Sequence, residues 1–178
     1  MMIDKSKTCC FTGHRPEKIY GGGDINSIHI RRVLSVLRTA IDEAVEEGYT
    51  TFITGMARGI DLWASRFVIE LKAKNPDIKL VCAIPYRDHG KDFEFEDKWN
   101  HMLAMSVADM VVYVSEKYSD DVMKKRNQYM VDNSSKIIAV IGDYRSGTGQ
   151  TLRYAQKKGL KTRVIDLNEN APMFCAYT

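Results

Sequence analysis

The residue types best suited to anion chemistry lie close together in residues 54–61, whose sequence is TGMARGID. A short β-branched run precedes this segment and an amphipathic pattern follows it, which predicts a strand, a turn and a helix. The amides of the first helical turn and the helix dipole favour an anion, and Arg58 could add a bidentate charge. The segment also fits an ordinary tight turn in which Asp61 helps to cap the helix. The predicted ligand-binding residues here are Gly55, Ala57, Arg58, Gly59 and Asp61.

A second glycine-rich helix start occupies residues 142–152, GDYRSGTGQTL. Gly147 and Gly149 allow a phosphate cradle made from backbone amides, and Thr148 and Thr151 add hydroxyl donors. The lysine and spacing of a P-loop are missing, and the segment is not the dinucleotide GxGxxG that follows a first strand. Together, the two glycine-rich starts predict a ligand that carries phosphate.

The first apolar run of the chain is followed by Gly13, His14 and Arg15. A histidine and an arginine beside a turn glycine suit an anion or a sugar hydroxyl. The alternative is a solvated loop in which Arg15 pairs with Glu17. Glycines 21–23 could let this loop close as a lid.

Another loop carries Pro85, Tyr86 and Arg87 after the third apolar run. Tyr86 could stack on a base and Arg87 could meet a phosphate. An ordinary proline-started loop with an ion pair between Arg87 and Asp88 explains the same residues equally well. We expect Trp99, in the helix that follows, to belong to the core.

A later polar helix contains the basic run Lys124, Lys125 and Arg126, followed by Asn127. The two lysines fit a solvated helix face. Arg126 instead falls near the apolar stripe of the same helix, so it and Asn127 are candidates for the binding site.

Six short apolar runs must position these loops. They are continuous rather than alternating, which is typical of strands buried on both faces of a parallel sheet. They span residues 8–12, 51–54, 80–84, 110–114, 137–141 and 162–167. Because ligands bind at the carboxyl ends of such strands, the loops above are expected to converge.

Helical periodicity separates the runs, with helices expected around residues 30–45, 60–71, 99–107, 122–133 and 152–155. Gly48 and Gly159 supply stops, and Asn75-Pro76 ends the second helix. Alternating strands and helices predict an α/β, three-layer, doubly wound Rossmann-like fold with a mostly parallel sheet of about six strands. We expect one domain over residues 1–178, with an irregular tail at 168–178.

Composition limits the possible functions. The chain has 178 residues, 44% hydrophobic and 28% charged, enough for one globular core. A formal charge of +3 permits phosphate or nucleic acid without requiring either. No secretory signal or membrane-spanning run is present, so a cytoplasmic protein is expected.

The cysteines and histidines show no metal-ligand spacing. Cys9, Cys10 and Cys82 lie in apolar runs, and none of the cysteines forms a CxxC pair. We expect reduced, mostly buried thiols, no metal and no required cofactor beyond a nucleotide-type ligand.

Three of these segments resemble one superfamily. The TGMARGID segment resembles the SGxARGID motif of the DNA-processing protein A (Smf) family, and Arg126-Asn127 resembles its RN element. Residues 146–151, SGTGQT, resemble the second glycine loop of that family and the GGxGT loop of the Lonely-guy (LOG) phosphoribohydrolases. With FTGHRP at residues 11–16, the chain is most similar to the YpsA-like (DUF1273) branch of the bacterial SLOG superfamily, over residues 7–167. The resemblance implies a Rossmann-like domain that binds nucleotides or nucleotide-derived ligands.

The same resemblance leaves the reaction open. LOG enzymes cleave an N-glycosidic bond with a glutamate three residues after the threonine of GGxGT, where this chain has Thr151. Arg58 and Asp61 are the catalytic candidates if a hydrolase activity exists, and Glu17 could also replace the carboxylate. DNA-processing proteins bind single-stranded DNA, but this chain lacks a strongly basic stripe with interleaved aromatics.

The leading expectation is therefore a binding module, a sensor or regulator, for a nucleotide or a phosphoribosyl or ADP-ribose-like ligand. A LOG-like hydrolase is the first alternative and single-stranded DNA binding the second. The resemblance also makes a homodimer that pairs through helices plausible.

Overall fold

A computed structural model describes residues 2–20, 24 and 26–168. Its centre is a six-stranded sheet in the order β4-β3-β2-β1-β5-β6, and every neighbouring pair is parallel. The strands are β1 (Thr8–Gly13), β2 (Thr51–Thr54), β3 (Lys79–Tyr86), β4 (Met110–Ser115), β5 (Lys136–Ile141) and β6 (Lys161–Asp166). The chain runs outward from β1 to β4 and then returns to the other side of β1. All six expected strands are confirmed, as is the Rossmann-like α/β class.

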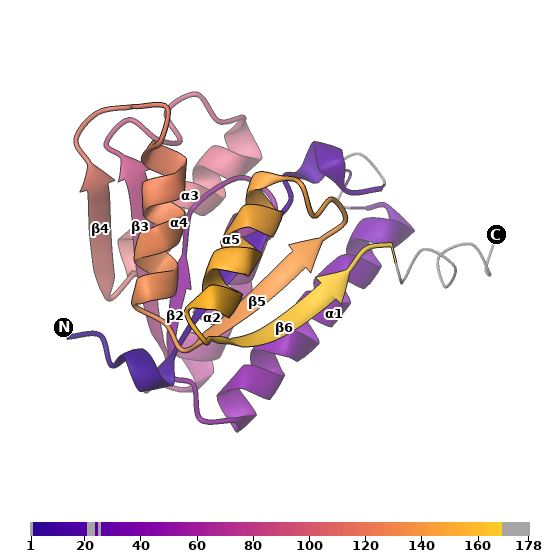
Figure 1. The fold of residues 1–178 in the computed structure, drawn as a ribbon, viewed down its shortest axis with the longest axis vertical. Coiled ribbons are helices and arrows are strands. Elements are labelled where there is room, and N and C mark those ends of the chain that lie inside the picture. The colour runs from indigo at the N-terminus through magenta and orange to yellow at the C-terminus, as the bar shows by residue number, and fades with distance from the viewer. Residues whose placement is uncertain (1, 21–23, 25, 169–178) are drawn as a thin grey trace.

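Five α-helices cover the two faces of the sheet (Figure 1). One face carries α1 (Ile28–Glu46), α2 (Ile60–Lys74) and α3 (Phe95–Val107), and the other carries α4 (Val122–Asp132) and α5 (Gly147–Lys157). Short 3-10 helices, η1 (Lys5–Lys7) and η2 (Pro16–Lys18), flank β1. Gly48 and Gly159 both have positive φ, 93° and 78°, just after α1 and α5, as expected of C-terminal stops.

The apolar core is divided by the sheet. Phe11 and Phe52 stack at 6.0 Å on the α1–α3 face, where Leu37 and Leu62 are fully buried. Cys10, Ile53 and Met130 belong to the α4–α5 face. Alternate residues of the same strand therefore serve both layers, which is why the strands of this sheet are continuously apolar.

One core expectation is wrong. Trp99 is 60% exposed. The neighbouring apolar side chains Phe95 and Met102 are also exposed, at 85% and 58%. Helix α3 packs through Asn100, His101 and Ala104 instead. Its apolar residues lie three and four positions apart on the outward side, so helical periodicity alone could not show which side faced the sheet.

Other sequence expectations concern thiols, metals and membranes. Cys9, Cys10 and Cys82 are free and buried, as expected, and Cys175 lies outside the described residues. Within the described part of the chain, no group of three or more metal-ligating side chains converges. No helix there is long and apolar enough to cross a membrane. The predicted lid glycines 21–23 and all but the first residue of the predicted 168–178 tail also lie outside the described residues.

Candidate functional site

Three loops meet at the carboxyl edge of the sheet. Gly13, at the end of β1, lies against Ile60 so closely that a Cβ would overlap its side chain. Gly59, with a φ of 83°, lies under the His14 carbonyl and the Pro16 ring. His14 in turn contacts the loop after β5. The expected convergence of the first, second and fifth loops is therefore present, and it surrounds the point where the chain switches from one side of β1 to the other.

The β2–α2 loop is held from beneath by a buried ion pair. Arg126 of α4 donates through Nη1 to the Gly55 carbonyl and lies 3.1 Å from Asp61 Oδ2. The same carboxylate accepts the Ala57 amide at 3.3 Å. A Cβ on Gly55 would overlap the guanidinium, so only glycine fits there. Both charged side chains are 6% exposed, which makes them part of the interior rather than of an open site.

Burial dominates the electrostatics of this pair. It raises the pKa of Asp61, while Arg126 opposes the shift. It also lowers the pKa of Arg126, which Asp61 opposes. Arg126 Nε has no hydrogen-bond partner among the described residues. Asp61 therefore accepts hydrogen bonds that fix a backbone turn, which is a positioning role, and its carboxylate lies away from solvent.

A histidine holds the same loop from the side. His89 Nε2 lies 3.2 Å from the Met56 carbonyl, so Nε2 carries the proton and donates it. Met56 has a φ of 61°, rare for a residue with a side chain, and its amide donates to Thr54 Oγ1 at 3.3 Å. Burial, followed by the charge of Arg126, lowers the pKa of His89 to about 4. The imidazole is therefore neutral at physiological pH.

Arg58 points out of this loop toward two carboxylates. Its Nε donates to Asp97 Oδ2 at 2.7 Å, and its Nη1 lies 3.3 Å from Glu17 Oε1. The Asp97 hydrogen bond raises the pKa of Arg58. Its guanidinium thus links η2 to α3. The alternative considered for this loop, a pair between Arg15 and Glu17, does not form: Glu17 bonds Arg58, and Arg15 is exposed.

The β5–α5 loop is held by a second buried histidine, His14. His14 Nε2 accepts the amides of Gly142 at 2.8 Å and Asp143 at 3.0 Å. The proton of the neutral ring must then be on Nδ1, which lies 3.4 Å from Thr148 Oγ1. Burial and the charge of Lys18 lower the pKa of His14, and Asp143 opposes them. His14 thus orients the predicted phosphate loop from inside.

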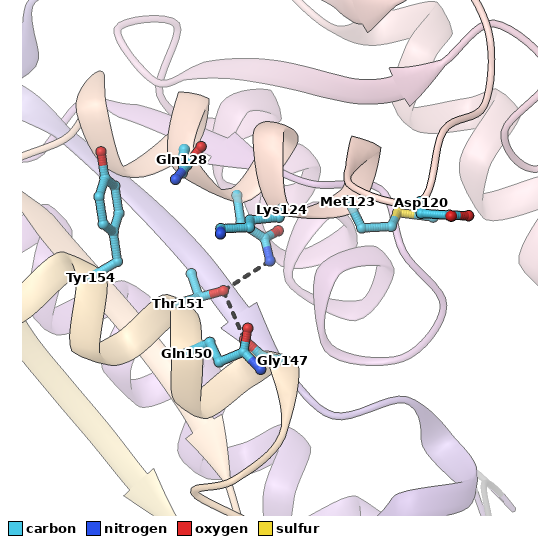
Figure 2. Close-up of a pocket in the computed structure, with 9 residues that line it drawn as sticks. Asp120, Met123, Lys124, Gln128, Gly147, Gln150, Thr151 and Tyr154 are labelled. Atoms are coloured by element: carbon cyan, nitrogen blue, oxygen red, sulfur yellow. Dashed lines mark hydrogen bonds between the residues drawn. The ribbon is translucent and has the colours of Figure 1, made fainter.

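A groove of about 370 Å³ lies between α4 and α5 (Figure 2). Asn127 Nδ2 donates to Thr151 Oγ1 at 2.8 Å, and Thr151 donates to the Gly147 carbonyl at 2.9 Å. This chain of hydrogen bonds fixes the spacing of the two helices at the groove. The lining residues are Asp120, Met123, Lys124, Asn127, Gln128, Gly147, Gln150, Thr151 and Tyr154.

The electrostatics of the groove favour an anion at its α5 end. Ser146 caps α5 by accepting the Gly149 amide at 3.3 Å, but the first amides of a helix have no acceptor within the helix itself. The helix dipole adds partial positive charge there. Lys124 contributes a full charge from α4, while Lys125 is paired with Asp121 at 3.0 Å. The lining also includes the Asp120 carboxylate, which opposes an anion near it, and uncharged amides and hydroxyls make up much of the rest.

The predicted site residues of α4 and of the two glycine-rich helix starts, apart from Arg58, fall into two groups. Asn127, Gly147 and Thr151 line the groove. Thr148 and Gly149 lie buried beside it in the first turn of α5. The β2–α2 residues Gly55, Ala57, Gly59 and Asp61, with Arg126, belong to the packed interior of the edge.

The predicted residues after β3 lie apart from the groove. Pro85 is buried within β3, and the Tyr86 ring packs edge-on against His89 and Tyr118. Arg87 pairs with Glu116 at 2.5 Å rather than with Asp88.

Six groove residues were not predicted as a site: Asp120, Met123, Lys124, Gln128, Gln150 and Tyr154. A signal for them existed. On both helices the lining positions recur every three or four residues, which marks one mainly polar stripe on each. The sequence could not show that these two stripes face each other.

The geometry defines a class: a Rossmann-like α/β domain whose glycine loops gather at the carboxyl edge of a parallel sheet. The YpsA model, described as the YspA SLOG family, matches residues 9–169. The chain therefore belongs to the YpsA-like SLOG family, as the sequence motifs indicated. This membership supports a nucleotide-related role without naming a ligand.

The chain is also similar to individual proteins. An uncharacterised SPbeta prophage-derived protein, YoqJ of Bacillus subtilis (strain 168), is 35% identical over 68% of this chain and 78% of its own length. A UPF0398 protein of Bacillus thuringiensis (strain Al Hakam) is 26% identical over 85% of this chain and 83% of its own. The X-ray structure of DNA processing protein A from Streptococcus pneumoniae has a TM-score of 0.48 and 16% identity, covering 94% of this chain. The chain spans 62% of that protein.

Proposed function

We propose that this protein binds a nucleotide or a nucleotide-derived phosphoribosyl ligand in the α4–α5 groove and acts as a sensor or regulatory module. The observation that carries the proposal is the groove itself. It has about 370 Å³ of space beside the amino-terminal turn of a glycine-rich helix, within the size range of small-molecule sites.

The lining suits the parts of such a ligand. A phosphate would lie against the first amides of α5 and near Lys124, where the dipole and the lysine both favour negative charge. Asn127, Gln128 and Gln150 offer amide donors and acceptors for ribose hydroxyls or a base edge. Tyr154 adds an aromatic surface at the far end of the groove, where a base could stack.

The same geometry favours binding over hydrolysis. Asp61, the candidate carboxylate, is buried against Arg126 and already accepts the Ala57 amide. Thr151, at the position of the LOG glutamate, uses its hydroxyl to bridge Asn127 and Gly147. Neither group is arranged to activate water or to stabilise an oxocarbenium-like sugar.

A charge substitution at the start of α5 tests the proposal. A Cβ on Gly147 meets no atom within 4 Å, so a small side chain fits without strain. Gly147→Asp should keep or raise the melting temperature, because an acidic residue stabilises a helix amino terminus, yet it should repel a phosphate. Gly147→Asn is the matched neutral control.

Thermal shift and calorimetry would use AMP, ADP-ribose, NAD and cyclic AMP as probes. At least one should raise the melting temperature of the wild type in a saturable way. The shift should disappear in Gly147→Asp and persist, weakened at most, in Gly147→Asn. If no probe binds the wild type, or if both variants bind equally well, the proposed site is wrong.

A further inference from the structure

The two edges of the sheet differ in chemistry. The β6 edge, Lys161–Asp166, has the sequence KTRVID, and its Arg163 pairs with Glu43 at 2.9 Å. The β4 edge, Met110–Ser115, has the sequence MVVYVS and contains no charged residue. Natural proteins usually guard an open sheet edge with charges, prolines or bulges, because its unpaired backbone groups invite another strand. The β6 edge has such charges, and the β4 edge does not.

The side chains of β4 are also less buried than those of β1, β2, β3 and β5. Every residue of β5 is buried, but none of β4 is. Met110 and Val112 pack partly against the α4–α5 core, and Val111 packs partly against the opposite core. Tyr113 is 36% exposed. An additional strand beside β4 would therefore cover apolar surface on both faces of the sheet.

Ion pairs lie at both ends of this segment, and between them the Arg87 guanidinium also stacks over the Tyr113 ring at 4.8 Å. At its amino end Asp109 is held by Lys72 and Lys79, and at its carboxyl end Glu116 is held by Arg87. Only a strand of about five uncharged residues fits between these ion pairs without opposing a charge. Of the two edge strands of the sheet, only β4 itself matches this length and polarity.

We propose that two copies of the chain associate through antiparallel pairing of their β4 strands, forming one continuous sheet across a two-fold axis. In an antiparallel pair, opposite residues share a face of the sheet. A two-fold axis normal to the sheet therefore passes midway between the two copies of one residue. An axis at Val112 pairs Val112 with itself, Val111 with Tyr113, and Met110 with Val114. These are aliphatic and aromatic pairs of the kind that stabilise sheets.

Neighbouring registers are worse. An axis at Val111 places Asp109 opposite Tyr113, and an axis at Tyr113 places Met110 opposite Glu116. Each would pull a charge out of its ion pair and set it against an apolar side chain. The Val112 register alone keeps every pair between positions 110 and 114 uncharged. This contact differs from the helix-to-helix pairing that the family resemblance suggested.

Disulfide trapping tests the register directly in the full-length chain carrying Cys175→Ser, since the other three cysteines are buried. Val112→Cys places two thiols at the axis, with the Cα separation of an antiparallel pair, which a disulfide can span. Mild oxidation should give a covalent dimer on a non-reducing gel. Val114→Cys is the matched control, because its two copies would lie about 13 Å apart along the strands.

Sedimentation or light scattering provides the second measurement. The wild type should have twice the mass of the chain, and Val112→Lys should reduce it to the mass of one chain. Thr162→Lys, on the charged β6 edge, should leave the dimer intact. Circular dichroism spectra and melting temperatures establish that both variants are folded.

Three results would overturn the proposal. They are a monomeric wild type, a dimer that survives Val112→Lys in a folded variant, and equal crosslinking at positions 112 and 114. The first of these includes a monomer that takes up a strand from another protein.

Discussion

The β2–α2 loop and the β5–α5 loop start from similar sequences and meet at the same edge of the sheet, yet they are built differently. In the first, Gly55, Met56 and Ala57 each have a backbone group bonded to a buried side chain. In the second, His14 holds the loop from inside, and the first turn of α5 borders an open groove. A glycine-rich helix start can therefore serve as an interior support or as a binding surface, depending on which side chains reach it.

Two histidines make the contrast sharper because they use opposite tautomers. His89 donates from Nε2 to a carbonyl of the first loop, whereas His14 accepts at Nε2 from two amides of the second. Because His14 Nε2 accepts hydrogen bonds from two amides of the second loop, these amides are not available to an anion. The anion-binding capacity of the second loop is thereby confined to the start of α5.

The largest expected effect comes from breaking the support of the first loop. Arg126→Met should lower the free energy of unfolding by about 3–5 kcal/mol, because it leaves Asp61 charged and buried without its partner. Urea denaturation measures this, with exposed Lys125→Met as the control, expected to change stability by less than about 0.5 kcal/mol. A loss below about 1 kcal/mol would mean that the pair does not support the loop.

Acidification should weaken the same loop through His89. Its pKa is 6.5 in a model compound and about 4 in the folded chain, so the unfolded state binds more protons between these values. The free energy of unfolding should therefore fall as pH drops from about 6.5 to about 4, by up to about 3 kcal/mol, and then level off. His14 and His101, whose pKa values are also lowered by burial, add in the same direction.

Denaturation curves across this pH range would measure how steeply the free energy of unfolding changes with pH. His89→Gln should reduce this slope, because a glutamine amide can still donate to the Met56 carbonyl but does not titrate. An unchanged slope in this variant would assign the pH dependence to other groups.

Two glycines of the second loop should respond differently to alanine. A Cβ on Gly149 would overlap the Tyr144 carbonyl, so Gly149→Ala should destabilise the fold by about 2 kcal/mol or more. Gly147 has open space around it, so Gly147→Ala should leave stability within about 0.5 kcal/mol. Thermal unfolding of the two alanine variants measures the difference. Similar losses of stability in both would show that the loop packs differently on its groove side.

The smallest effect concerns ligand affinity. Lys124→Ala should weaken binding of whichever phosphate probe binds the wild type by about three- to tenfold, more at low salt than at high salt. Lys125→Ala, which removes a lysine already paired with Asp121, should change affinity less than twofold. Equal losses of affinity in the two lysine variants would indicate general electrostatic attraction by the helix rather than a contact in the groove.

Much of this architecture was predictable. All six strands were expected within two residues at each end, because continuous apolar runs between turns indicate buried parallel strands. The convergence of the first, second and fifth loops was also predictable, since parallel strands end at one edge. Trp99 was misplaced because the most apolar side of α3 faces solvent.

The sequence by itself determined the fold class, the family and the edge of the sheet at which the glycine loops gather, because these depend on local periodicity and short motifs. Only the tertiary structure decided which loop is interior and which is open. Arg126 reaches Gly55 across 71 positions and His14 reaches Gly142 across 128. The groove likewise exists only because α4 lies beside α5, where hydrogen bonds between Asn127, Thr151 and Gly147 set its walls. Contacts between residues so distant in sequence leave no mark in local periodicity, so the roles of the two glycine loops could be assigned only in three dimensions.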